Sequence, residues 1–149
     1  MSDANDTRRS EIEALEKRRF ERFKAELQVR YRVLHPDERH KILKEGQFSA
    51  PDAVSVMESA VRELLQVFSQ DVSLGGFSLA TAQPLPKNLE LLVQLTLPQV
   101  PVPVSALAEV RWSRPMPGGK NFQSGLKFSL ISAQDLGRLE SFIRLQNRS

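Results

Sequence analysis

The chain contains no cysteine among its 149 residues, and this absence narrows the chemistry that it can perform. Disulfides, thiolate nucleophiles, zinc ribbons and iron–sulfur clusters are all excluded. The two histidines, His35 and His40, flank the polar stretch PDER and are interpreted as solvated rather than metal-binding or catalytic. The sequence therefore predicts neither a metal site nor a cofactor.

Long apolar runs are also missing. No segment approaches the roughly 20 apolar residues that a membrane-spanning helix needs. The polar start MSDANDTRRSEIE lacks the apolar core of a signal peptide. These absences predict a cytoplasmic protein with no membrane insertion, and the length suits one compact domain.

Aromatic residues that stack on nucleic-acid bases are scarce, with one tryptophan and one tyrosine. The formal net charge is only +3, and the basic residues that gather in the first quarter of the chain are interspersed with acidic ones. A nucleic-acid platform has a broader and less neutralised basic face. This distribution favours a site for a small anion over nucleic-acid binding.

The periodicity of apolar residues divides the chain into helical and extended parts. We assign residues 1–16 to an N-terminal helical arm with a thin apolar stripe, and residues 17–149 to a single domain. A half-buried strand is predicted over residues 26–34, because apolar and polar residues alternate there. One face of this strand carries Leu27, Val29, Tyr31 and Val33, and the other carries Gln28, Arg30 and Arg32.

The connection after this strand is long. Residues 36–66 form a predicted insertion with a helix over 51–65, where apolar residues recur at intervals of three and four. The end of this stretch also fits a strand, and we expect the change around residues 65–67. If the apolar stripe of this helix is exposed, it is a candidate surface for a homodimer.

Regularly spaced strand-like runs fill the second half of the chain. They are FSLAT, NLELLVQLTLP, VPVSALAEVRWS and KNFQSGLKFSLI, separated by turn-forming residues. Runs of this number and spacing are typical of a small antiparallel barrel. A C-terminal helix is predicted over 133–146, where Ser132 and Asp135 resemble a capping box. Trp112 is interpreted as part of the barrel core or rim.

Two polar motifs interrupt the apolar pattern. In QDVSLGG, Asp71 and Ser73 are two residues apart, so an extended chain points both to one face. The adjacent Gly75 and Gly76 permit positive φ, or close approach of another backbone or a flat ligand. The motif fits either a recognition edge or a tight turn in which the two polar side chains bond to their own backbone.

The second motif lies before the first strand. The stretch KRRFER places Arg18 and Arg22 four residues apart, with Arg19 between them, so that in a helical turn the outer two share a face. Taken together, RxxxR before a first strand and DxSxxG at a later strand end resemble the signature of the PilZ domain family. The resemblance runs from about Lys17 to the last helix, and AEVRW and SGLKF are similar to the final barrel strands of that family. The insertion looks longer than in most members.

The resemblance implies a mainly β fold, namely a six-stranded antiparallel barrel with flanking helices. It also implies that the chain binds the bacterial second messenger cyclic di-GMP, often as a stacked pair of molecules. The binding residues that it implies are Arg18, Arg19, Arg22, Asp71, Ser73, Gly75 and Gly76. Ligand binding would rearrange the N-terminal segment and signal to an effector protein of unknown identity.

The chemistry of these residues suits that ligand for independent reasons. An arginine fork donates two parallel hydrogen bonds to guanine O6 and N7, or to a phosphate. An ionised aspartate accepts from guanine N1–H and N2–H. Two other functions remain open: a PilZ-like interaction module that does not bind the nucleotide, and an enzyme that uses Asp71 as a base or nucleophile. The motif offers no nearby histidine or second carboxylate, so an enzyme is not expected.

Overall fold

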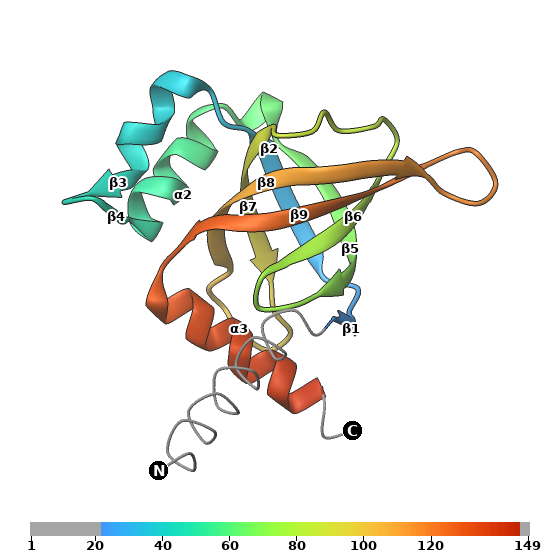
Figure 1. Ribbon diagram of the computed structural model, residues 1–149. Coiled ribbons are helices and arrows are strands. Elements are labelled where there is room, and N and C mark those ends of the chain that lie inside the picture. Colours follow the sequence, from blue (N-terminus) through green and yellow to red (C-terminus); the bar gives the residue numbers. More distant parts are fainter. Residues whose placement is uncertain (1–21, 147–149) are drawn as a thin grey trace, which may run out of the picture.

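The computed structural model describes residues 22–146 and shows a β-barrel flanked by helices (Figure 1). The predicted N-terminal arm, residues 1–16, lies outside the described residues, and so do Arg18 and Arg19. None of the described helices is long and apolar enough to cross a membrane. The elements, in which η marks a 3-10 helix, are β1 Phe23–Lys24, β2 Gln28–Val33, η1 Pro36–Ile42, β3 Leu43–Lys44, β4 Gln47–Phe48, α2 Ala50–Ser59, η2 Val61–Glu63, β5 Leu65–Val72, β6 Gly76–Thr81, β7 Glu90–Thr96, β8 Val104–Pro115, β9 Phe122–Ile131 and α3 Ala133–Gln146.

Six strands form the barrel in the order β5, β2, β7, β8, β9 and β6, and a further pairing of β6 with β5 closes it. Each of these pairings is antiparallel. The short strand β1 extends one wall by pairing with the end of β5. The predicted six-stranded antiparallel barrel is therefore confirmed, with strands where the alternating pattern placed them.

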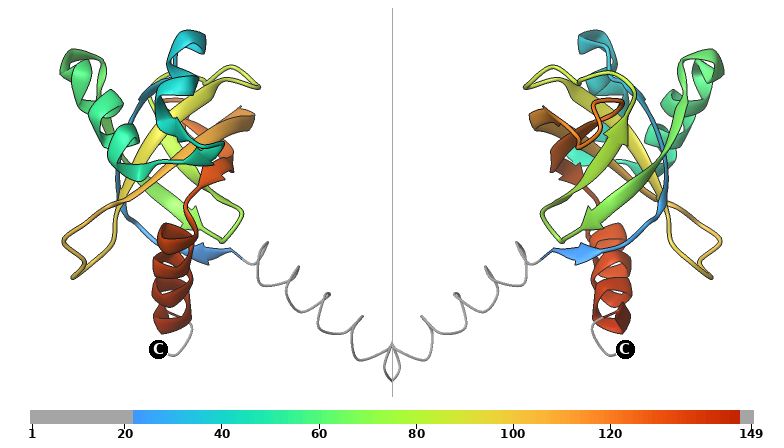
Figure 2. Two further views of the ribbon diagram at one scale, coloured as in Figure 1. Left: turned by 90° about the vertical axis from the view of Figure 1, so that its left-hand side faces the viewer. Right: turned by 90° about the vertical axis from the view of Figure 1, so that its right-hand side faces the viewer.

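The interior of the barrel is apolar and is covered at one end by α3 (Figure 2). The rings of Phe77 and Phe128 meet inside it, with centroids 5.5 Å apart. Leu139 and Ile143 of α3 are buried in the same cluster. The helix spans Ala133–Gln146, as predicted, and Ser132 caps it by accepting a hydrogen bond from the backbone of Asp135 at 3.1 Å.

The insertion packs on the outside of the barrel (Figures 1 and 2). Ile42 and Met57 are fully buried against Leu92 and Leu107 of β7 and β8. A second apolar cluster therefore lies outside the barrel wall. Since α2 turns its apolar side toward the barrel, the barrel largely covers the stripe that was a candidate surface for a homodimer.

The helix of the insertion is shorter than predicted. It ends at Ser59 rather than at residue 65, and a turn of 3-10 helix leads into β5. Leu65 pairs with Tyr31 of β2, which requires an extended backbone from that point. Strand pairing thus overrides the helical spacing of the apolar residues, and the predicted change to a strand occurs at Leu65.

Arg32 anchors the insertion to the barrel. The strand pattern places it on the polar face of β2, but the insertion covers that face and leaves Arg32 only 1% exposed. Its guanidinium donates to Glu38 Oε2 at 2.6 Å and to the Val56 carbonyl at 2.8 Å. Burial alone would raise the pKa of Glu38, but the hydrogen bonds from Arg32 and from the His35 backbone, together with the arginine charge, hold this pKa below its ordinary value.

Candidate functional site

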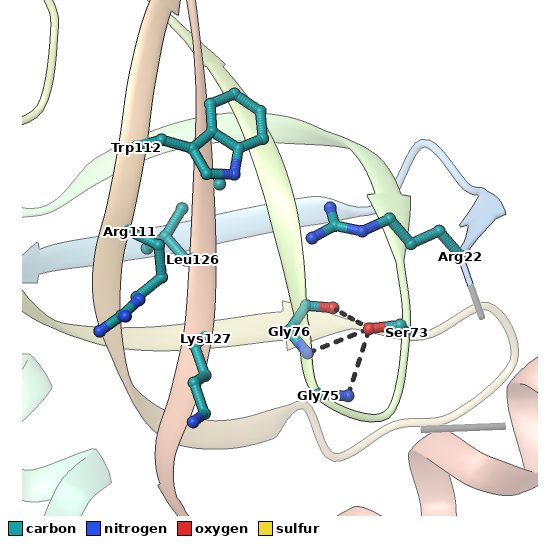
Figure 3. A pocket seen from close by; sticks show the side chains of 9 residues that line it. Arg22, Ser73, Gly75, Gly76, Arg111, Trp112, Leu126 and Lys127 are labelled. Carbon is teal, nitrogen blue, oxygen red and sulfur yellow. Dashed lines mark hydrogen bonds between the residues drawn. The ribbon is translucent and has the colours of Figure 1, made fainter. Parts of the chain in front are cut away.

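The turn between β5 and β6 is built around the hydroxyl of Ser73. The Ser73 N–H donates to the Gly76 carbonyl at 2.8 Å and closes the turn. The hydroxyl donates to the same carbonyl and accepts from the N–H groups of Gly75 and Gly76, each at 3.2 Å (Figure 3). A serine hydroxyl has one donor and two acceptor positions. All three are used within the turn, so the local-turn interpretation holds for Ser73.

Gly76 is required by its contact with β9. A Cβ atom at this position would lie 1.9 Å from the Leu126 carbonyl oxygen, and its φ is outside the positive range. Of the reasons considered for this glycine, close approach of another backbone is therefore the one observed. The carbonyl of Gly75 accepts from the Phe128 N–H at 2.9 Å, which ties the turn to β9.

The two sequence motifs meet in an ion pair. Arg22 Nη1 donates to Asp71 Oδ1 at 3.0 Å, although the residues are 49 positions apart. Strand β1 begins directly after Arg22 and pairs Lys24 with Asp71, which brings the arginine to the end of β5. The side chains of Arg22 and Asp71 are 45% and 23% exposed, so both remain within reach of a ligand.

A pocket of about 180 Å³ lies beside this pair (Figure 3). Figure 3 shows the Arg22 side chain reaching toward the strand of Gly76, with the Trp112 indole beyond it. The lining residues are Arg22, Ser73, Gly75, Gly76, Arg111, Trp112, Gly125, Leu126 and Lys127. The structure thus gathers four of the predicted site residues in one pocket, and Asp71 joins them through its ion pair.

Five lining residues were not predicted from the sequence, namely Arg111, Trp112, Gly125, Leu126 and Lys127. Trp112 stands half-exposed on β8, and a Cβ atom on Gly125 would lie 2.3 Å from indole Cε2. The ring therefore rests on bare backbone of β9. The guanidinium of Arg114 lies 4.8 Å from the ring centroid, a cation–π contact. This arrangement could be predicted only from the pairing of Trp112 with Gly125. That pairing is known only when the register of β8 against β9 is known.

The charge around the pocket favours an anion. Arg22, Arg111 and Lys127 line it, whereas Asp71 and Glu109 neutralise part of this charge. The Arg111–Glu109 contact is 3.1 Å and both side chains are partly exposed. Among residues 22–146 no group of three or more histidine, aspartate or glutamate side chains is arranged to hold a metal ion. The charges that line the pocket therefore suit the binding of an anionic ligand.

A second hollow, of about 570 Å³, adjoins Asp71. It is lined by Lys24, Ala25, Glu26, Ser69, Gln70, Asp71 and Gln123. Arg22 lines only the first pocket and Asp71 only the second, so their ion pair lies at the boundary between the two. The described site is therefore wider than the pocket in Figure 3.

Solved structures with the same fold cover most of this chain. The inhibitor of motility MotI/DgrA of Bacillus subtilis is similar over 86% of this chain, with a TM-score of 0.61 and 20% identity, and this chain spans about half, 50%, of that protein. A tetrameric PilZ domain from Xanthomonas campestris, self-assembled through a helical bundle, matches 91% of this chain and 95% of its own, with a TM-score of 0.55 and 16% identity. The PilZ domain of YcgR from Escherichia coli, with cyclic di-GMP, matches 89% and 93%, with a TM-score of 0.51 and 15% identity.

The comparison with curated protein sequences finds no match. The family model of the PilZ domain matches residues 16–145, which is most of the chain. This range includes both arginines of the RxxxR stretch, the turn of Ser73 and all six barrel strands. The chain therefore belongs to the PilZ domain family.

Proposed function

We propose that this PilZ domain is a receptor that binds cyclic di-GMP between its arginine segment and the β5–β6 turn, and that it signals to a protein partner. PilZ domains are nucleotide-binding receptor domains and not enzymes. The observation that carries the proposal is the meeting of Arg22 and Asp71, 49 residues apart, beside a cationic pocket. The PilZ domain of YcgR, which shares this fold, is described with cyclic di-GMP.

The phosphates of the ligand match the cations of the pocket. Arg22, Arg111 and Lys127 line it, and a guanidinium binds a phosphate through two parallel hydrogen bonds. Arg18 and Arg19, which lie outside the described residues, would add two further cations from the segment before β1. Each good bidentate contact is worth about 1–3 kcal/mol by analogy with base recognition in DNA.

The guanine edge matches Asp71. Its carboxylate accepts from Arg22 in this structure, and guanine N1–H and N2–H would replace that donor in the complex. An exposed ion pair of this kind is worth about 0–1 kcal/mol, so exchange of partners costs little. Trp112 offers a half-exposed indole face, and stacking of a base on such a ring is worth about 1–3 kcal/mol.

The proposed signal is a change in the segment that carries the arginines. The ligand shifts a population only by binding one arrangement better than another. Phosphates and bases that draw Arg18, Arg19 and Arg22 toward the β5–β6 turn would favour one position of the N-terminal segment, and an effector protein would then recognise that position. A receptor for an intracellular messenger acts in the cytoplasm, where the messenger is made.

Calorimetric titration with cyclic di-GMP tests the proposal, with GTP as the control ligand. The variants are Arg22→Ala and Asp71→Ala, each expected to weaken binding by about 10- to 100-fold. Arg39→Ala is the matched control, because Arg39 pairs with Glu90 at 2.7 Å and is 44% exposed, close to the 45% of Arg22. Arg39 lies outside both hollows, so its variant should bind like the wild type.

Saturable heat that is lost in both site variants and kept in the control would establish the receptor. A folded wild type that gives no heat with cyclic di-GMP would overturn the proposal and leave the interaction module that does not bind nucleotide. Equal weakening in Arg39→Ala would show that general positive charge, rather than this site, attracts the ligand.

A further inference from the structure

The first pocket is small for a cyclic dinucleotide. Its volume of about 180 Å³ is below the range of about 300–1,000 Å³ that is typical of ligand pockets. Among the described residues that line it, none has a carboxylate or amide side chain. It therefore offers cations for the phosphates, but no such acceptor for the N1–H and N2–H groups of a guanine. Asp71, at its boundary, accounts for one guanine, and cyclic di-GMP has two.

The second hollow supplies the missing space. It measures about 570 Å³ and meets the first pocket at the Arg22–Asp71 ion pair. Gln123 lines the second hollow and Gly125 lines the first pocket, and the two residues are two positions apart on β9. Residues two apart on a strand lie on the same face, so both openings are on one face of this wall. A ligand that lies across the ion pair would therefore reach both.

The floor of the second hollow is fixed by Ser69. Residues 25–27 lie between β1 and β2, and Ser69 of β5 bridges this break. Its hydroxyl donates to the Ala25 carbonyl at 2.6 Å and accepts from the Leu27 N–H at 2.9 Å. The Ala25 N–H in turn donates to the Gln70 carbonyl at 3.2 Å. The backbone on both sides of Ala25 is therefore held in place before a ligand binds, which lowers the entropic cost of binding.

Two exposed side chains of opposite charge, Lys24 and Glu26, line this hollow. Neither forms an ion pair with any residue from 22 to 146. A lysine only donates hydrogen bonds, and an ionised glutamate only accepts them. One edge of guanine presents the acceptor O6 beside the donors N1–H and N2–H. A lysine and a glutamate that line one hollow match this edge, whereas Glu26 and Asp71 would repel a phosphate there.

We propose that the second hollow binds one guanine base of the ligand, with Lys24 donating to O6 and Glu26 accepting from N1–H and N2–H. The phosphates would lie over the cations of the first pocket, so that a single molecule spans the Arg22–Asp71 pair. This assignment rests on the proposed function, because it concerns the same ligand. Lys24 and Glu26 would then select the base, while the cations of the first pocket select the negative charge.

Calorimetric titration with two ligands tests the assignment. Cyclic di-GMP is compared with cyclic di-IMP, which keeps the sugars, the phosphates, O6 and N1–H but lacks the amino group that carries N2–H. Glu26→Met removes the acceptor at nearly the same side-chain length. A hydrogen bond to a charged group is worth about tenfold in affinity or more, so this variant should bind cyclic di-GMP at least about tenfold more weakly. It should weaken cyclic di-IMP less, because that ligand has already lost one of the two bonds.

Lys24→Met should weaken both ligands by about the same factor, because both carry O6. Combined with Glu26→Met, it should cost less than the product of the two single losses, because both side chains hold the same base. The matched controls are Lys44→Met and Glu58→Met. These residues carry the same charges at exposed positions and line neither hollow, so their variants should bind both ligands like the wild type.

A reduced preference for cyclic di-GMP over cyclic di-IMP in Glu26→Met, with unchanged controls and one molecule bound per chain, would support the assignment. If the wild type binds cyclic di-GMP but Glu26→Met weakens both ligands equally, or neither, the assignment is wrong while the receptor stands. Multiplicative losses in the double variant, or two molecules bound per chain, would also count against it. A folded wild type that binds neither ligand would overturn both this assignment and the proposed function.

Discussion

Replacement of Ser73 by alanine tests whether the hydroxyl of this residue stabilises the β5–β6 turn. The hydroxyl makes three hydrogen bonds, all inside the turn and each 3.2 Å long. Its removal leaves the N–H of the buried Gly76 without that partner. We therefore expect Ser73→Ala to destabilise the fold itself, before any ligand is added.

The size of the effect follows from the contacts. A net hydrogen bond contributes about 0.5–1.5 kcal/mol, and these three are long and share one oxygen. The expected loss in the free energy of unfolding is about 2 kcal/mol, toward the low end of their sum. For a chain of 149 residues this corresponds to a fall of about 6 °C in Tm.

The assay is urea unfolding of the free protein, with Ser78→Ala as the control. Ser78 is also fully buried, in the same hairpin, but its hydroxyl has no hydrogen-bond partner in the described part of the chain. Its removal should therefore leave the stability unchanged or raise it by up to about 1 kcal/mol. If Ser73→Ala unfolds at the same urea concentration as the wild type, the hydroxyl is not holding the turn and the argument from its saturated hydrogen bonds is wrong.

Three further predictions concern the pocket and the insertion. Arg22→Ala should change the free energy of unfolding by about 0–1 kcal/mol and yet weaken cyclic di-GMP binding by about 10- to 100-fold; a large loss of stability in urea would contradict it. Gly125→Ala places a Cβ atom 2.3 Å from indole Cε2, so the emission of the single tryptophan, Trp112, should shift; unchanged emission would refute this contact. The pKa of Glu38 is lowered in the fold, so its contribution is present above its ordinary value of 4.5 and lost as the pH falls through the folded-state pKa. Urea unfolding at pH 7 and pH 3.5 should show a smaller acid-induced loss in Glu38→Gln than in the wild type, and equal losses would count against the Arg32 anchor.

The strands and the last helix were predictable because their signals are local. Alternation located the barrel strands, and the spacing of apolar residues with a capping serine gave Ala133–Gln146. The end of α2 was not predictable in this way. Its apolar spacing continues past Ser59, and only the pairing of Leu65 with Tyr31 requires an extended chain. A contact with a strand more than thirty positions earlier is not visible in a short window.

The candidate site could be predicted only in part, because its motifs are local but several of its contacts join distant strands. Asp71 and Arg22 were predicted as site residues from their motifs, but their contact depends on the pairing of β1 with β5, which the sequence pattern does not show. Close approach of another backbone was one of the reasons offered for Gly76, but the sequence could not select it, because the atom that excludes a side chain belongs to Leu126 on another strand. Trp112 fits barrel core or rim equally well by sequence, and its place in the pocket depends on the register with Gly125.

Because the insertion covers only part of the barrel, the strands differ in how deeply their residues are buried. Five consecutive residues of β7, from Leu91 to Leu95, are buried, because the interior cluster lies on one side and the insertion covers part of the other. In β5, by contrast, Leu65, Gln66 and Phe68 are exposed. Opening free energies follow the number of buried apolar contacts. Amide hydrogens of β7 should therefore exchange only through global unfolding, whereas those at the exposed start of β5, from Leu65 to Phe68, should exchange through smaller local openings.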